Sequence, residues 1–200
     1  MATISKRPDY AVIGEIVEPG TRVLDLGCGE GEVLAWLKET RQVLARGVEI
    51  SPEKVRRAIA RGVSVYQGDI EEGLKDYPDG AFDYVILSQT LQETRAPLQV
   101  LREMLRVGRR AIVSFPNFAH YSVRWAMLLT GHAPKTDEFP YDWYDSPNIH
   151  FLSIQDFENL CRDHGFFIEK RYFLSGAGRV RTLPNLMAQT AVFLLGPAPR

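Results

Sequence analysis

The chain has 200 residues, which suits one domain, and its 45% hydrophobic and 24% charged residues are ordinary for a globular protein. The formal net charge of −1 provides no field for nucleic acid or an anionic membrane, so we expect neither as a partner. The polar segment Met1–Tyr10 lacks the apolar core of a signal peptide, and no apolar run is long enough to span a bilayer. We therefore expect a cytoplasmic protein in which Cys28 and Cys161 are reduced thiols that bind no metal.

Short apolar runs alternate with helical patterns through the first half of the chain. Ser51 is a predicted N-cap, Pro52 occupies the first helical position, and Gly62 lies just past the end of that helix. Strands that alternate with helices predict a parallel sheet with right-handed crossovers. The expected strands are 22–26, 44–50, 63–66, 82–88 and 110–115, and the expected helices are 32–39, 52–61 and 97–106.

The pattern loosens between Pro116 and His150, a segment rich in aromatic residues, proline and acids, with one helical stretch around 123–129. This segment follows the predicted fifth strand, where a substrate lid would lie. Four acids in its second part could suggest a cation site, but they lack a regular ligand pattern, and an exposed acidic loop is the preferred interpretation. They are Asp137, Glu138, Asp142 and Asp145.

Regular structure returns at Ser153, where Ser-Ile-Gln-Asp resembles a capping box for a helix that stops at Gly165. Two closing strands, 166–174 and 189–195, flank a connection too short for a helical crossover, so we pair them antiparallel. The predicted fold is one Rossmann-like α/β domain over residues 1–200, with a lid or acceptor segment at about 116–150. Its sheet has about seven strands, mostly parallel with an antiparallel last strand, and helices on both faces.

The segment Val-Leu-Asp-Leu-Gly-Cys-Gly-Glu-Gly (23–31) follows a predicted strand and opens a helix. Its glycines allow a tight turn and close approach to a ligand, and the helix N-terminus offers free N–H groups to a carboxylate or phosphate. Asp25 suits a ligand with an ammonium group better than a pyrophosphate. A dinucleotide fingerprint starting at Gly27 needs glycine at position 32, where Glu32 stands, so an NAD(P) oxidoreductase is a distant alternative.

Two further signals follow this loop. Glu49 ends the second predicted strand, 20 residues after Gly29, which is the spacing of an acid that accepts hydrogen bonds from ribose hydroxyls. Gly-Asp-Ile at 68–70 follows the third strand, so that Asp69 could accept from an adenine amino group and Ile70 could pack on the ring.

The three segments resemble motifs of S-adenosylmethionine (SAM)-dependent methyltransferases. The resemblance implies SAM or S-adenosylhomocysteine as the cofactor, with Cys28 serving as a small loop residue and Gln89 as a contact from the fourth strand. The predicted cofactor-binding residues are Asp25, Gly27, Cys28, Gly29, Gly31, Glu49, Ile50, Asp69, Ile70 and Gln89.

Four more segments extend the resemblance along the chain, at 104–109, 114–125, 139–151 and 183–186. With the glycine loop they resemble the MetW family of methionine biosynthesis proteins over essentially the whole sequence. That resemblance implies a methyltransferase fold and a role in methionine biosynthesis beside homoserine O-acyltransferase. It supplies neither a methyl acceptor nor a catalytic base.

The residues leave the chemistry open. His120, Tyr121, Tyr141, Tyr144 and His150 could shape an acceptor pocket or act as a base, although packing is the commoner role for such side chains. After the fourth strand the chain reads Ser-Gln-Thr-Leu-Gln, in place of the Asn/Asp-Pro-Pro-aromatic signature of amino-methyltransferases. Two hypotheses remain: a methyltransferase for a small molecule or protein, and a non-catalytic SAM-binding subunit of the acyltransferase.

Overall fold

The computed structural model describes residues 7–197, so the first six residues of the polar segment Met1–Tyr10 lie outside the described residues. No helix in the described part is long and apolar enough to cross a membrane. The helices are α1 (Pro8–Ile16), α2 (Glu32–Arg41), α3 (Pro52–Ala60), α4 (Ile70–Gly73), α5 (Pro97–Val107), α6 (Tyr121–Thr130), α7 (Ile154–Asp163) and α8 (Pro184–Met187), with a 3₁₀ turn at Leu91–Glu93. The strands are β1 (Arg22–Leu26), β2 (Leu44–Glu49), β3 (Ser64–Gln67), β4 (Phe82–Ser88), β5 (Gly108–Pro116), β6 (Phe167–Ser175), β7 (Gly178–Arg179) and β8 (Thr190–Gly196).

The strands form one sheet in the order β3-β2-β1-β4-β5-β8-β6-β7. The first five pair parallel with one another. Strand β8 pairs antiparallel with β6, as predicted, and also with β5. The sheet has eight strands where about seven were expected, because the two-residue β7 pairs with the end of β6. The chain leaves β1 in one direction and returns to β4 on its other side, which creates the crevice where open α/β sheets bind ligands.

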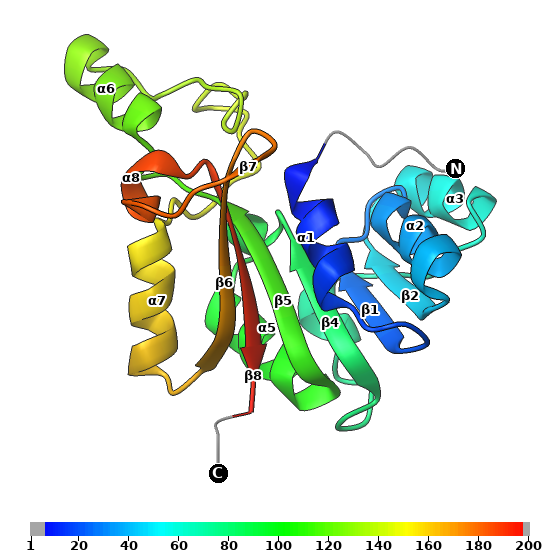
Figure 1. Ribbon diagram of the computed structural model, residues 1–200. Coiled ribbons are helices and arrows are strands. Elements are labelled where there is room, and N and C mark those ends of the chain that lie inside the picture. Colours follow the sequence, from blue (N-terminus) through cyan, green and yellow to red (C-terminus); the bar gives the residue numbers. More distant parts are fainter. Residues whose placement is uncertain (1–6, 198–200) are drawn as a thin grey trace.

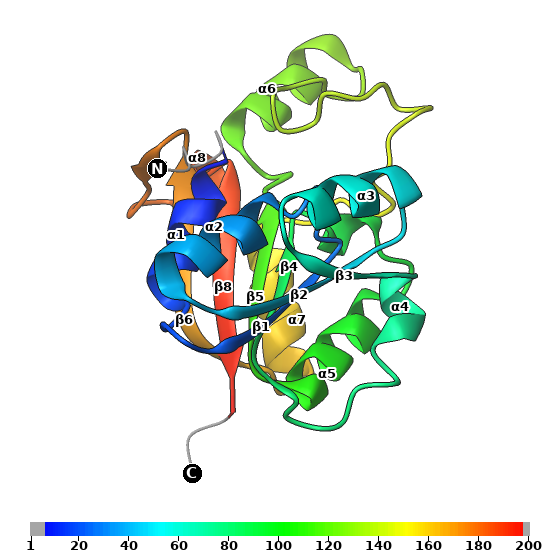
Figure 2. The same cartoon turned by 90° about the vertical axis from the view of Figure 1, so that its right-hand side faces the viewer.

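Helices cover both faces of the sheet, with α1 and α2 on one face and α5 and α7 on the other (Figures 1 and 2). Each face has its own cluster of buried apolar side chains. β4 contributes to both clusters, since Tyr84 and Ile86 point to one face and Val85 and Leu87 to the other. Its uninterrupted apolar sequence thus reflects a strand that is covered on both sides.

The α7 face is centred on three aromatic rings that pack against one another. Phe115 of β5 lies parallel to Phe193 of β8, with ring centroids 5.8 Å apart. Phe157 of α7 packs against both, at 5.0 and 4.7 Å. The capping box that begins α7 is present, since the Ser153 hydroxyl accepts from the Asp156 N–H and the Asp156 carboxylate accepts from the Ser153 N–H.

Helix α1 was not predicted, because its polar start conceals the apolar residues that follow. Pro8 occupies its first turn, and Val12, Ile13 and Ile16 are buried against the sheet. Both cysteines are free and buried, in agreement with reduced thiols. The helical stretch expected at 123–129 is α6, which extends away from the sheet (Figure 1).

We expect Phe193→Ala to lower the free energy of unfolding by about 3–5 kcal/mol, because it removes a fully buried ring and leaves a cavity between Phe115 and Phe157. Urea unfolding at constant pH measures the change. Phe167→Ala on β6 is the control, since that ring is 38% exposed and its loss should cost much less. Equal effects of the two substitutions would contradict the aromatic cluster as the centre of this face.

Candidate functional site

The glycine loop joins β1 to α2 at the carboxyl edge of the sheet. Gly27 and Gly29 have left-handed φ angles of 69° and 56°, which favour glycine. The loop is held to β2 because the Val48 carbonyl accepts from the Gly27 and Cys28 N–H groups, at 2.8 and 3.0 Å. A Cβ on Gly29 would meet no heavy atom within 4 Å, so this residue borders open space where a ligand can approach the backbone.

Two adjoining cavities lie at this edge, with volumes of about 380 and 320 Å³. Together they have the size of an ordinary small-molecule site. The larger contains Glu49, Asp69 and Gln89, and the smaller contains Asp25 and Cys28. The residues that line both are Arg7, Gly27, Gly29, Lys54 and Ser88.

Nine of the ten residues predicted to bind a cofactor line one of these cavities. Gly31 is the exception. A Cβ there would lie 3.0 Å from the Cβ of Ala58 and 3.2 Å from the Val63 side chain, so this glycine allows α2 to begin close against α3.

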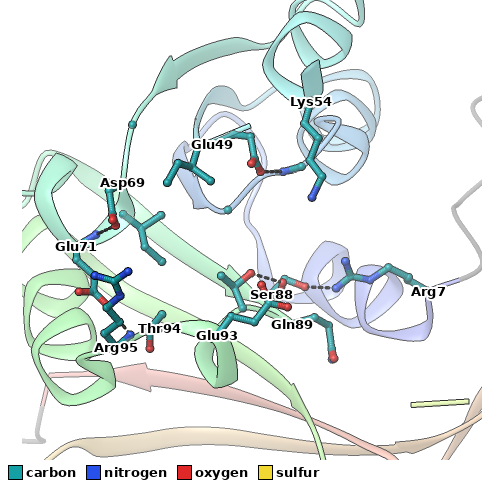
Figure 3. A pocket seen from close by; sticks show the side chains of 16 residues that line it. Arg7, Glu49, Lys54, Asp69, Glu71, Ser88, Gln89, Glu93, Thr94 and Arg95 are labelled. Carbon is teal, nitrogen blue, oxygen red and sulfur yellow. Dashed lines mark hydrogen bonds between the residues drawn. The ribbon is translucent and has the colours of Figure 1, made fainter. Parts of the chain in front are cut away.

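Glu49 is buried at the end of β2 and joins two loops. One of its carboxylate oxygens accepts from the Gly29 N–H at 2.9 Å, and the other accepts from the Ser51 N–H at the same distance. Each oxygen retains a further lone pair for a ligand. Figure 3 shows Glu49 and Lys54 on one side of the larger cavity, with Ser88, Gln89 and Glu93 facing them.

Asp25 is 3% exposed, and its Oδ1 atom has no hydrogen-bond partner within the described residues. Burial raises the pKa of this carboxyl to about 8, and the neighbouring Asp9 and Glu49 add to the shift while Arg7 opposes it. An unpaired buried carboxyl beside a cavity is suited to a cationic ligand, which would supply both the missing hydrogen bond and the missing positive charge.

Asp69 and Gln89 are two further predicted cofactor contacts, and local backbone structure fixes the position of each. Asp69 is the N-cap of α4 and accepts from the Glu71 N–H with Oδ1, at 2.9 Å. Gln89 has a left-handed φ of 56°, which is uncommon outside glycine and asparagine, and its N–H donates to the Ser114 carbonyl. The strained backbone turns the chain sharply at the carboxyl end of β4, next to the cavity.

The start of the described chain adds residues that sequence reasoning missed. Arg7 Nη2 donates to Asp9 (2.8 Å) and to the Ser88 hydroxyl (2.6 Å), and Nη1 donates to the Tyr10 hydroxyl (3.1 Å). The Ser88 and Ser114 hydroxyls donate to the same Asp9 oxygen, at 2.6 and 2.9 Å. This buried network fixes α1 across the ends of β4 and β5. The signal in the sequence was Pro8 followed by a helical apolar pattern, but it could not indicate where the helix packs.

None of the five candidate catalytic side chains lines either cavity. His120 is buried as the N-cap of α6, its Nδ1 lies 2.7 Å from the Ser122 hydroxyl, and burial lowers its pKa. The Nε2 atoms of His120 and His150 are buried without a partner among the described residues. Tyr121, Tyr141 and Tyr144 are exposed. Their suggested roles in an acceptor pocket stay predictions.

The lining offers the kinds of group that a SAM molecule would need. The unpaired Asp25 carboxyl fits an amino-acid ammonium group, the open space beside Gly29 fits a backbone-contacting chain, and Glu49 retains acceptor capacity for ribose hydroxyls. Ile50 and Ile70 give the larger cavity apolar surface beside Asp69. The donor set therefore fits the group that the sequence implies.

The family model described as "Methionine biosynthesis protein MetW" matches residues 7–195 of the chain. The chain is 38% identical to the bifunctional methionine biosynthesis protein MetXA/MetW of Rhodopirellula baltica, over 94% of this chain. It spans about a third (32%) of that relative's length.

Solved structures support the fold. A SAM-dependent methyltransferase from Archaeoglobus fulgidus superposes with a TM-score of 0.71 at 17% identity, covering 96% of this chain and 95% of the other. A SAM-dependent methyltransferase from Thermotoga maritima, described as a possible histamine N-methyltransferase, gives 0.68 at 19% identity, over 96% and 89%. The fold is therefore that of the class I SAM-dependent methyltransferases.

We expect Asp25 to make the protein less stable as the pH rises from about 4 to 8. Between the unfolded pKa near 4 and the folded value of about 8, the folded state holds a proton that the unfolded state lacks, so the free energy of unfolding falls with increasing pH. Relative to Asp25→Asn, the wild type should lose on the order of 1 kcal/mol per pH unit in this window. Urea unfolding of both proteins at pH 5, 6, 7 and 8 tests this, and parallel curves would show that Asp25 ionises normally.

Proposed function

The chain belongs to the MetW family of methionine biosynthesis proteins, and on this basis we propose that it binds SAM or S-adenosylhomocysteine and acts together with a homoserine O-acyltransferase. The observation that carries the cofactor part is the pair of adjoining cavities, which bring Asp25 and Gly29 of the glycine loop, Glu49 and Asp69 together from three separate segments. If the glycines only formed a surface turn and Glu49 were only a solvated strand end, these residues would have no reason to meet at one cavity.

In the proposed complex each part of the cofactor has its own residues. Asp25 receives the ammonium group, and the loop at Gly27–Gly29 passes close to the methionyl chain. Glu49 accepts from the ribose hydroxyls with the lone pairs that its two backbone bonds leave free. Asp69 and Ile70 hold the adenine, through the amino group and the ring face respectively.

SAM, when bound, carries a methyl group activated by its sulfonium centre. The residues of this chain would orient it, since Ser88 at the end of β4 and Gln89 just after it lie beside the glycine loop, and Ser88 accepts from Arg7 of the Arg7–Asp9 pair. Methyl transfer is an in-line displacement, so alignment alone can supply much of a rate enhancement. The lack of an assigned base therefore leaves catalysis open.

The partnership rests on the relative from Rhodopirellula baltica, in whose name MetXA and MetW are parts of one bifunctional protein. Such fusion keeps two activities at high effective concentration. We infer that the present chain supports a homoserine-acylating enzyme of the same pathway and responds to SAM, the activated form of the pathway's product. The cytoplasmic location expected from the sequence stays a prediction.

The alternative is an independent SAM-dependent methyltransferase that acts on a small molecule or a protein. The observation that favours it is the completeness of the cofactor cavity, which a purely structural subunit would not need. Methyl transfer from labelled SAM to a metabolite extract or to the acyltransferase would support this alternative.

We expect Glu49→Ala to weaken SAM binding by about 1.5–3 kcal/mol, which is the range for hydrogen bonds to a charged group. Isothermal titration calorimetry with SAM measures the change. Glu53→Ala is the matched control, because Glu53 lies nearby on α3 but is exposed and pairs with Arg57. An affinity unchanged by Glu49→Ala would show that the ribose assignment is wrong.

The decisive measurement for the proposed function is titration of SAM and S-adenosylhomocysteine into the protein, with and without the cognate homoserine O-acyltransferase. We expect the acyltransferase to bind and to tighten cofactor binding, because two sites that influence each other do so reciprocally. Cofactor binding that ignores the acyltransferase would favour the independent methyltransferase. Absence of cofactor binding in both titrations would refute both the SAM-binding partner of the acyltransferase and the independent methyltransferase.

A further inference from the structure

Helix α6 leaves most of its apolar side chains exposed, with the largest of them on the side opposite its one buried residue, Val123. Val123 is buried, and with 3.6 residues per turn Tyr121, Trp125 and Leu128 lie on the opposite side of the helix. Leu129 borders this stripe, and Leu128 and Leu129 are 73% and 76% exposed. An amphipathic helix normally buries such a stripe in its own core. Here most of the stripe is exposed, although Tyr121 packs on the neighbouring His120 ring with the centroids 4.3 Å apart, so another surface is expected to cover it.

The apolar surface continues beyond the helix. The loop that follows α6 runs back beside it in both views (Figures 1 and 2), and this loop exposes the Trp143 and Tyr144 rings. At the base of α6 a hollow of about 250 Å³ lies between Arg124, the first turn of α7 and the Leu183–Leu186 segment. Hollows of this kind receive the anchoring side chains of a partner protein.

Leu183 is the most unusual residue at this hollow. Its φ is 46°, in the left-handed region that an ordinary side chain avoids, and the side chain is largely exposed. A strained backbone that displays a leucine to solvent is not explained by the packing of the domain itself. Both the strain and the exposure are explained if the Leu183 side chain contacts a partner protein.

We propose that the outward face of α6, together with Leu183, is the docking surface for the homoserine O-acyltransferase. This inference rests on the proposed function and adds to it the location of the contact. We call this docking surface the α6 face. It consists of four side chains of α6, namely Tyr121, Trp125, Leu128 and Leu129, together with Leu183.

Charge around the α6 face favours a protein over a membrane. The loop beside the helix carries Asp137, Asp142 and Asp145, of which Asp142 is paired with Lys135, whereas Glu138 is half-buried near Thr190 and does not contribute to this rim. Within α6 the single cation is Arg124, which donates to the Ala119 carbonyl at 2.6 Å. Helices that lie on anionic lipid carry several lysines or arginines on their polar side. An acidic rim around an apolar stripe instead fits an apolar groove with a basic rim on the acyltransferase.

The relative from Rhodopirellula baltica supports this choice of occupant. MetXA and MetW are named there as parts of one protein, and this chain matches 32% of it, so most of that polypeptide is outside the match. A second copy of this chain would bring a second acidic rim against the first, which like-charge repulsion disfavours.

The test uses the full chain, its cognate homoserine O-acyltransferase and the double variant Leu128→Asp/Leu129→Asp. We expect the variant to weaken binding of the acyltransferase by at least about 30-fold, the effect of losing central anchor residues, while its affinity for SAM stays unchanged. Ile59→Asp is the matched control, since Ile59 is also an exposed helical residue but lies on α3. Calorimetry gives both affinities, and Trp125→Ala replaces the double variant if that protein fails to bind SAM.

Four results would overturn the inference. If the α6 variant binds the acyltransferase as well as the wild type does, the partnership stands and the docking surface is wrong. If the wild-type protein does not bind the acyltransferase, the proposed partnership fails and the docking surface fails with it. If the variant changes only self-association, measured by sedimentation velocity, the occupant of the surface is a second copy of this chain. If it changes only binding to phosphatidylglycerol–phosphatidylethanolamine vesicles, the occupant is a membrane.

Discussion

The two hydrogen bonds that the Glu49 carboxylate accepts shape the larger cavity, the proposed cofactor site. They join the loop after β1 to the start of α3, so the ends of two parallel strands are held at a fixed separation. Backbone donors on both sides also stabilise the charge of a carboxylate that is almost fully buried. With this acid in place, the Gly29 backbone faces the cavity and Asp25 is left behind the loop without a partner. The positions of the Gly29 backbone and the Asp25 carboxyl therefore both follow from the hydrogen bonds of Glu49.

A second buried acid performs the corresponding task on the other side of the crevice. Asp9 collects donors from Arg7, Ser88 and Ser114, and so connects α1 to the ends of β4 and β5. Glu49 lines the larger cavity and Asp9 lines neither, and both of these buried acids have hydrogen-bond donors. Asp25 lines the smaller cavity and its Oδ1 has no donor among the described residues, so its charged form is the one that a cationic ligand would stabilise.

The sequence predicted the central strands well, and nine of the ten residues proposed to bind a cofactor line the two cavities, because the signals for both are local. Phe82–Ser88 is a continuous apolar run, and the glycine loop and Glu49 keep a fixed spacing along the chain. It missed α1, α4 and α8, and it could not identify Arg7 or Lys54 as cavity residues. Those side chains reach the site only through packing between distant segments, which periodicity does not encode. Reasoning from residue type alone could not place His120, whose ring caps α6 and lines neither cavity.

The position of β8 has a consequence for the order in which the protein can fold during synthesis. This strand follows β5 and β6 in the chain, yet it lies between them and pairs with both. The β3-β2-β1-β4-β5 half can form while the ribosome is still translating, whereas β6 has no neighbour in the sheet except β7 until residues 190–196 emerge. Until then the edges of β5 and β6 are both unpaired, and such edges recruit strands from other chains. A nascent chain that pauses before this point is therefore exposed to aggregation, and chaperone contact is most useful in that interval.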